Sequence, residues 1–453
     1  PLLAPVIHVL GIVLLLGVPT LAMGATLPVF GLVARAYGTS IAMLYGLNTV
    51  GAAFGVLAMA FVVVPLMGVS ATVRIVASLN LFVAAGAFLF PVAVSSAHES
   101  VSTPPRISSK ASGTISWPLA MFIVFTTGAA TFALEVAWFR AMRAAFMSTT
   151  KSFAIMLAAV LIPLAISSCF VPWLRRRGVT LGPFLIAGAV ATLIATPVME
   201  RMDLLCITLQ RGLRTETFSW MMLSWLGMSL VVIGPAILFL SVALPWFLHG
   251  QSEPRRWGGL YAVNTVGAIL GAIGAAWVLL PTIGFARTSW LMGILVGLVA
   301  LAIFWGRVRW IGAPALVASI AVAILFESGL GRLRVQGQAS HCEVLAYEES
   351  RDATVSVIEV EGEFGARELI IDGCHAASEH ERANYMTWMG KLPMLAHADP
   401  ERALVLCFGS GQTANAVRRE EPRTIDLVEL SPVVYEMAHH FKSNENVLED
   451  ARV

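Results

Sequence analysis

The stretch LYGLNTVGAAFGVLAMAFVVVPLMG, residues 44–68, recurs as LYAVNTVGAILGAIGAAWVLLPTIG, residues 260–284, at a constant offset of 216 residues. We refer to these as the first and second stretches. Each is an apolar run long enough to cross a bilayer, which takes about 20 residues. Membrane proteins are often built from two related helical bundles, so the pair predicts such a domain. Matched residues include Tyr45 and Tyr261, Asn48 and Asn264, Thr49 and Thr265, Val50 and Val266, Gly51 and Gly267, Gly55 and Gly271, Pro65 and Pro281, and Gly68 and Gly284.

Similar apolar runs continue on both sides of the two stretches. The chain has 453 residues, of which 57% are hydrophobic and 13% charged, and its mean hydropathy is +0.78. Soluble domains carry about 25% charged residues, so a single soluble domain is excluded. Internal prolines predict a tilt or kink in the first and seventh of ten expected membrane helices. These helices are expected near residues 5–33, 41–66, 71–95, 117–142, 152–174, 181–198, 219–248, 259–281, 287–305 and 310–326.

Two asparagines within these helices are the first candidate functional residues. Asn48 and Asn264 share helix faces with GxxxG pairs, which allow a neighbouring helix to approach closely. The two amides either hydrogen-bond across such a helix contact or line a substrate path. The GxxxG pairs are Gly51 with Gly55, and Gly267 with Gly271.

One carboxylate is also a candidate. Glu135 is the only acidic residue well inside an expected membrane helix. An intramembrane carboxylate is either paired or functional, because an isolated charge in hydrocarbon is costly. Glu135 is therefore expected to form a structural ion pair or to anchor the end of the helix, or else to bind a proton or a ligand. Arg140 and Arg143, one to two turns further on, could pair with Glu135 or with another helix.

Charge is divided unevenly along the chain. Residues 1–327 carry a formal charge of +11 and residues 328–453 one of −9. The change indicates a membrane domain followed by an acidic soluble tail. An acidic tail repels phosphate, so no nucleic-acid partner is expected. The expected divisions are a first membrane bundle at 1–95, a Ser/Pro-rich linker at 96–116, a second bundle at 117–327, a small β subdomain at 328–380 and an α/β domain from 381 to 453.

The first part of the tail has the pattern of a small antiparallel sheet. Short runs that alternate apolar and polar residues follow one another, and Asp372-Gly373 is a turn dipeptide between strands. A helix is expected next, over residues 381–397, ending near Pro393. The expected strands are CEVLAY (342–347), ATVSVIEV (353–360) and ARELIIDG (366–373).

The segment ALVLCFGSGQTANAVRREEPRTIDLVEL, residues 403–430, predicts a strand, a glycine-rich turn, a helix and a second strand. The first strand is continuously apolar, which is typical of a parallel strand buried on both faces. Gly409 and Gly411 allow the backbone to approach a nucleotide closely. Glu429 follows 20 residues after Gly409 and can accept hydrogen bonds from both ribose hydroxyls. Because residues 409–414 also fit GxGxxA, NAD stays open as the nucleotide.

The text around this segment, IIDGCHAASEHERANYMTWMGKLPMLAHADPERALVLCFGSGQTANAVRREEPRTIDLVELSPVVYEMAHHF (370–441), resembles the spermidine synthase, or polyamine aminopropyltransferase, family. That resemblance covers residues 342–453. The membrane stretches look like those of bacterial membrane proteins fused to a spermidine synthase-like domain. The fold implied is a polytopic α-helical membrane bundle, followed by a small β-hairpin subdomain and a Rossmann-like, methyltransferase-type α/β domain.

The resemblance also implies a cofactor site. Decarboxylated S-adenosylmethionine, or S-adenosylmethionine, would be bound without a metal, and a polyamine nitrogen would attack the propyl carbon beside the sulfonium. Tyr385 would contact the amine substrate. The residues implied to bind the cofactor are Gly409, Ser410, Gly411, Gln412, Glu429 and Leu430.

Several positions depart from the family pattern. Gln412 replaces an acid in the glycine loop, and Ala376 replaces a Gln that follows the Asp-Gly turn. The family's Tyr-His-Glu reads Tyr385-Met386-Thr387 in this chain. The family's catalytic Asp would follow a later strand than those present before Val453, so no catalytic residue is assigned. Segments of the full protein are therefore expected to be missing at both ends.

Three functions fit these observations. The first is a membrane-anchored aminopropyltransferase-like enzyme that acts on a polyamine. The second is a transporter for a polyamine or another small cation, with a catalytically inactive tail that senses a nucleotide, and the third is an NAD-binding regulatory module. The expected location is the bacterial inner membrane, with many bilayer crossings and the tail in the cytoplasm. A homodimer is a further expectation.

Overall fold

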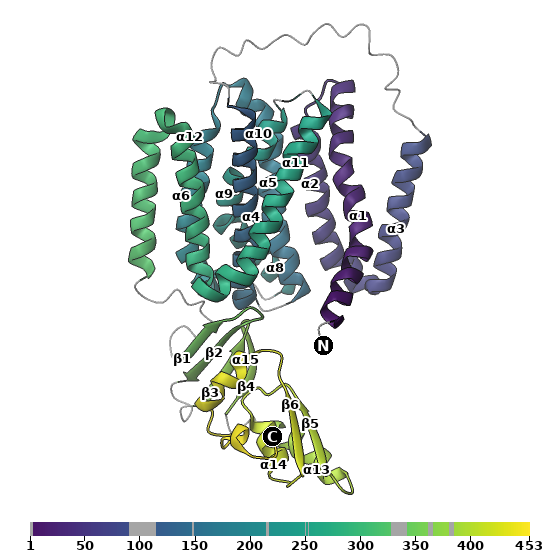
Figure 1. Ribbon diagram of the computed structural model, residues 1–453, viewed down its shortest axis with the longest axis vertical. Helices are drawn as coiled ribbons and strands as arrows, with labels where there is room; N and C mark the ends of the chain where they lie inside the picture. The colour runs from purple at the N-terminus through teal and green to yellow at the C-terminus, as the bar shows by residue number, and fades with distance from the viewer. Residues whose placement is uncertain are drawn as a thin grey trace.

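The computed structural model describes residues 3–89, 115–146, 149–213, 217–249, 251, 253–327, 342–360, 366–379 and 385–453. Most of the predicted linker, 96–116, and the start of the β subdomain lie outside these ranges. The described chain is mostly helical, with a bundle of long helices and a smaller C-terminal part that contains the strands (Figure 1). The helices of the bundle are α1 (Leu3–Ala36), α2 (Ile41–Ala58), α3 (Val64–Leu89), α4 (Trp117–Phe146), α5 (Thr150–Arg176), α6 (Leu181–Met199), α7 (Met202–Leu213), α8 (Phe218–Val232), α9 (Gly234–Leu240), α10 (Ala243–His249), α11 (Pro254–Gly274) and α12 (Leu280–Glu327).

Several of these helices are long and apolar enough to cross a membrane. Within the described residues there are seven such helical segments, or eight if the bent pair from Phe218 to His249 is one crossing. Two of them, Ile41–Leu89 and Arg255–Gly306, have 49 and 52 residues, about twice the length of one crossing. Each predicted membrane helix overlaps one of these segments, although those at 5–33, 71–95 and 310–326 extend beyond them, and residues 90–95 lie outside the described chain.

Proline acts differently at the two predicted kinks. α1 continues through Pro19 and Pro28 without a non-helical residue, so no break forms there. The seventh predicted helix is instead divided into α8, α9 and α10, and its two halves are bent by 48°. Pro235 stands in the first turn of α9, where its missing N–H breaks no helical hydrogen bond.

The two stretches share backbone features that their sequence pattern did not predict. A five-residue π-helix follows α2 at Met59–Val63 and another follows α11 at Ala275–Leu279, again 216 residues apart. Gly68 and Gly284 then leave the helical region, with φ of 75° and 76°. This backbone conformation breaks the helix at each glycine, and residues that carry a side chain rarely adopt it.

The GxxxG prediction holds for the second stretch and is wrong for the first. A Cβ on Gly271 would lie 2.1 Å from the carbonyl oxygen of Ala129, so α11 touches the backbone of α4 there. A Cβ on Gly51 or Gly55 would meet nothing within 4 Å. α2 instead packs on α5 through a different face, on which Gly46 is buried against α5.

The difference can be tested with one substitution at matched positions. Gly271→Ala should reduce stability by about 1–3 kcal/mol or more, because the added methyl has no room against the α4 backbone. Gly55→Ala, its equivalent in α2, should leave stability unchanged or slightly raised. Thermal unfolding of the detergent-solubilised chain measures both, and equal effects would contradict the packing described.

The small sheet of the tail is antiparallel, with strand order β1-β2-β3-β4. Its first three strands agree with the prediction, whereas β4 was not predicted. Asp372 and Gly373 form the turn between β3 and β4 with φ of 48° and 78°, as expected of a two-residue hairpin turn. The strands are β1 (Cys342–Glu349), β2 (Thr354–Val360), β3 (Arg367–Ile371) and β4 (Cys374–Ser378).

The end of the tail contains a two-stranded parallel sheet. β5 (Arg402–Leu406) pairs with β6 (Thr424–Val428), and α14 (Gln412–Arg418) connects them. α13 (Tyr385–Ala396) precedes β5 and continues three residues past Pro393, so the predicted helix end was wrong. The remaining helices are α15 (Pro432–Glu436) and the 3₁₀ turns Met437–His440 and Val447–Glu449.

β5 is not buried on both faces, contrary to the prediction. Leu404 and Leu406 are 61% and 65% exposed, whereas Val405 is buried in a core with residues of α13 and α14. Helices therefore cover one face of this parallel pair in the part of the chain that is described. A larger Rossmann-like sheet remains an expectation.

The tail is joined to the helical bundle by two arginines of α4. Arg140 donates hydrogen bonds to the carbonyl oxygens of Ser350 and Arg351, at 2.6 and 3.2 Å, in the loop between β1 and β2. Arg143 forms an ion pair with Asp372, which also accepts a hydrogen bond from the backbone N–H of Thr354. Both arginines therefore bind the tail.

A second contact joins β1 to the break at Gly284. The backbone N–H of Phe285 donates to the Glu349 carboxylate at 2.9 Å, and a Cβ on Gly284 would lie 3.2 Å from the same carboxylate. Burial raises the pKa of Glu349, against the opposing effect of the Tyr347 hydroxyl. The small sheet thus contacts the bundle through both α4 and α12.

A double-mutant cycle tests the charge pair at this junction. Asp372→Asn keeps an acceptor for Thr354 and tolerates the positive φ, but it removes the charge that faces Arg143. Asp372→Asn and Arg143→Gln should each reduce stability by about 1–3 kcal/mol, and the double variant should be little worse than either. Additive losses in thermal unfolding would contradict the pairing. Glu253→Gln, which removes an exposed pair with Arg256, should have no measurable effect.

Candidate functional site

The glycine-rich turn after β5 has the tight backbone that the sequence predicts. Cys407, Gly409 and Gly411 have φ of 69°, 60° and 80°, and Gly411 caps the N-terminus of α14. A Cβ on Gly411 would lie 2.6 Å from both the Phe408 ring and the Cβ of Asn444. Only glycine fits this position, because both the conformation and the space exclude a side chain.

The Glu429 carboxylate points back towards this turn. One oxygen accepts a hydrogen bond from the backbone N–H of Phe408 at 2.8 Å. The other accepts from the N–H groups of Leu430 and Ser431 at 2.7 and 3.1 Å. These bonds fix the carboxylate at the carboxyl ends of β5 and β6, where ligands bind in open α/β sheets.

An aromatic pair lies beside this carboxylate. The rings of Phe408 and Tyr435 are 5.2 Å apart. Burial, and then the charge of Glu429, raise the pKa of the Tyr435 phenol. The sequence reasoning missed both aromatic residues, although each lies within six residues of a predicted site residue.

The other predicted cofactor residues differ in their exposure. Ser410 is 1% exposed, and its hydroxyl has no hydrogen-bond partner in the described chain. The side-chain oxygens of Gln412 and Ser431 are likewise buried without a partner there. Leu430 is 87% exposed, beside Glu429. Three buried polar atoms without a partner in the described chain therefore lie in or beside the glycine turn, and buried polar atoms of this kind call for an explanation.

The predicted substrate residue lies on the adjoining helix. Tyr385 begins α13 and is exposed. The next residue, Met386, accepts a hydrogen bond from the Thr413 hydroxyl at 3.0 Å, which places Tyr385 near the start of α14. β4 is also close, since a Cβ on Gly409 would lie 3.6 Å from Ala377. Ala376, which stands in place of the Gln of the family pattern, precedes Ala377 in β4.

No protein-family model matches the chain. Part of the chain is similar to polyamine aminopropyltransferases. The enzyme of that name from Nitrosomonas europaea is 38% identical over 93 residues, which cover 20% of this chain and 28% of the relative. That from Oceanobacillus iheyensis is 24% identical over 200 residues, 41% of this chain and 38% of the relative. The chain thus spans about a third of the length of these relatives, and the similarity supports a spermidine synthase-like function at the level of the family.

Metal ligands do not gather in the described residues. No group of three or more His, Cys, Asp or Glu side chains that could hold a metal ion is found among them. None of the cysteines in these ranges forms a disulfide.

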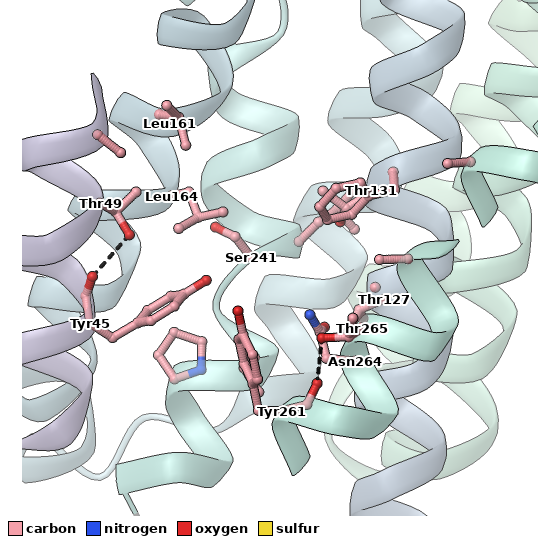
Figure 2. A pocket seen from close by; sticks show the side chains of 18 of the residues that line it. Tyr45, Thr49, Thr127, Thr131, Leu161, Leu164, Ser241, Tyr261, Asn264 and Thr265 are labelled. Carbon is pink, nitrogen blue, oxygen red and sulfur yellow. Dashed lines mark hydrogen bonds between the residues drawn. The ribbon is translucent and has the colours of Figure 1, made fainter. Parts of the chain in front are cut away.

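Asn48 and Asn264 both line one cavity in the bundle. Figure 2 shows this cavity with Asn264 on one side of it. α2 packs on α5 and α11 packs on α4, and no hydrogen bond of either amide across these contacts is found among the described residues, so their role in helix packing stays a prediction. Gly128 of α4 lies against Asn264, since a Cβ added to Gly128 would lie 2.7 Å from the side-chain amide oxygen of Asn264. The alternative hypothesis, that the two amides line a path or site, stays open.

The predicted pairing of Glu135 with Arg140 or Arg143 is wrong. Both arginines bind the tail, and Glu135 has no ion-pair partner among the described residues. Glu135 lies half-buried on α4 and does not line the cavity. The structure therefore brings the two asparagines together and leaves the carboxylate apart from them.

The unpaired hydroxyl of Ser410 gives a prediction about the ligand-free chain. Ser410→Ala should leave stability unchanged or raise it by about 1 kcal/mol, because it removes a buried polar group that lacks a partner. Ser350→Ala is the matched control and should reduce stability, since that hydroxyl is hydrogen-bonded to Ala353. A Ser410→Ala variant that unfolds earlier than wild type would show that the hydroxyl is bonded within the fold.

Proposed function

We propose that the chain belongs to a membrane-anchored, spermidine synthase-like transferase whose tail binds decarboxylated S-adenosylmethionine and acts on a polyamine. The observation that carries this proposal is the Glu429 carboxylate, held at the carboxyl end of β6 and turned towards the glycine turn. An acid in this place accepts hydrogen bonds from ribose hydroxyls in nucleotide-binding α/β folds. The similarity to polyamine aminopropyltransferases supports the same choice.

Each part of the proposed cofactor has residues that suit it. The open backbone at Gly409 and Gly411 accommodates the ligand's close approach, and Ser410 and Gln412 supply polar atoms. Glu429 accepts the ribose hydroxyls, and the exposed side chain of Leu430 lies beside it for contact with the adenine. When bound, the cofactor supplies an aminopropyl group on a sulfonium. On this proposal the parallel pair β5 and β6 is part of a larger Rossmann-like domain.

The acidic tail supports a polyamine as the second substrate. Its formal charge of −9 attracts a polycation and raises the polycation's local concentration. Tyr385, exposed near the glycine turn, is the proposed contact for the amine. The free cysteines suit a reducing compartment, so we place the tail in the cytoplasm, with the helices in the inner membrane of a bacterium.

Titration calorimetry on the full, detergent-solubilised chain tests the proposal. Decarboxylated S-adenosylmethionine should bind, and Glu429→Gln should weaken its binding by about tenfold or more, because a charged acceptor for the ribose is lost. Glu436→Gln, on the exposed side of the nearby α15, should bind normally. Unchanged binding by Glu429→Gln would contradict the proposed role of Glu429.

Three further ligands separate the alternatives. S-adenosylmethionine and methylthioadenosine share the adenosyl group and should compete with the decarboxylated cofactor, whereas NAD should not. Tight binding of NAD alone would overturn the proposal in favour of a regulatory module. Formation of methylthioadenosine from the cofactor and putrescine, measured by chromatography, is the expected sign of transfer.

A further inference from the structure

A cavity of about 470 Å³ lies inside the helical bundle. The first and second stretches form two of its walls through α2 and α11, and the other walls come from α4, α5 and the segment around α10. Figure 2 shows the phenol groups of Tyr45 and Tyr261 pointing into the space between these helices. The volume lies in the range of small-molecule sites, which is about 300–1,000 Å³.

The polar groups of the cavity come in matched pairs. Tyr45 and Tyr261, and Asn48 and Asn264, occupy equivalent positions in the two stretches. In the described chain neither amide and neither phenol hydroxyl has a hydrogen-bond partner, whereas the neighbouring threonine hydroxyls donate to carbonyl oxygens of their own helices. Polar groups left unpaired within a bilayer are costly, so a ligand with donors and acceptors would be stabilised here.

Charged side chains do not line this cavity in the described residues. An ion would lose its hydration on entry and find no opposite charge, which is strongly unfavourable within a bilayer. The faces of two tyrosine rings attract a cation by only about 0.5–2 kcal/mol each. The lining therefore favours an uncharged ligand over the small cation that a polyamine transporter would carry.

Two of the lining residues are accessible in the described chain. Phe132 of α4 and Ile269 of α11 line the cavity and are 40% and 51% exposed. Both lie within helical segments that are long and apolar enough to cross a membrane, so a ligand that reaches them within a bilayer would come from its hydrocarbon.

The π-helices lie next to this cavity. Ala272 is the last lining residue of α11, and the π-helix begins three residues later at Ala275. The equivalent π-helix of the first stretch begins at Met59, seven residues after the lining residue Ala52. π-helical turns are strained and occur frequently at functional sites, which is a second and independent indication.

We propose that this cavity binds a small, uncharged, lipid-soluble molecule with an apolar body and at least one hydroxyl or carbonyl group. The apolar walls hold the body, and Tyr45, Tyr261 and the two asparagines bind the polar group.

Photolabelling of the full chain in phosphatidylcholine vesicles tests the proposal. The probe is an uncharged long-chain alcohol that carries a diazirine, and mass spectrometry of peptides locates the label. Labelling should saturate on α2, α4 and α11. The double variant Ala52→Trp, Ala268→Trp, which fills the cavity from both stretches, should reduce it by about fivefold or more.

Matched variants keep this result interpretable. Val50→Trp with Val266→Trp places the same two tryptophans at exposed positions of the same helices and should leave labelling unchanged. Asn48→Leu with Asn264→Leu keeps the branching and the number of side-chain heavy atoms but removes both amides, and should weaken labelling by the alcohol about tenfold, which also serves if the tryptophan variants do not fold. Labelling by a trimethylammonium probe of the same chain length should not saturate.

Other results would overturn the proposal. Uniform labelling of all exposed helices, or equal labelling of the cavity-filling and control variants, would show that the probe reports lipid contact only. Saturable labelling by the cationic probe in preference to the alcohol would assign the cavity to a cation. Neither result depends on whether the tail binds an adenosyl compound.

Discussion

The contact between α4 and the tail holds the two halves of the described chain together. Arg140 and Arg143 lie near the C-terminal end of α4 and bind two carbonyl oxygens and a carboxylate of the tail. The tail provides the acceptors for both guanidinium groups. Loss of this contact would leave two charges without partners at the end of α4, which is energetically unfavourable where they are buried. The position of the small sheet, and through it of the glycine turn beside β4, depends on this contact (Figure 1).

Local sequence signals predicted much of the fold. Long apolar runs located the long apolar helices, and the Asp372-Gly373 dipeptide located a hairpin turn. The strand, glycine turn, helix and second strand of residues 403–430 were also predicted correctly, because glycine spacing and apolar runs are local properties. Glu429 lies where its spacing from Gly409 predicted, although its role in binding remains a proposal.

Partner choice over long distances could not be predicted in this way. Gly51 and Gly55 have the same spacing as Gly267 and Gly271, yet only the second pair packs on another helix, because α2 turns a different face to its neighbour. The arginines near Glu135 were expected to pair with it, since the sequence does not show that the tail provides competing acceptors. β4 was missed because CHAAS, residues 374–378, lacks the residues typical of strands.

α4 is a single continuous helix that takes part in both regions. Thr131 lines the cavity and Arg140, nine residues later, binds the tail, so the two points are about 14 Å apart along the same axis. A helix behaves as a stiff rod over this length, and α4 has no break at which it could flex. Sliding or rotation of α4 would therefore displace the lining of the cavity and the contact with the tail together.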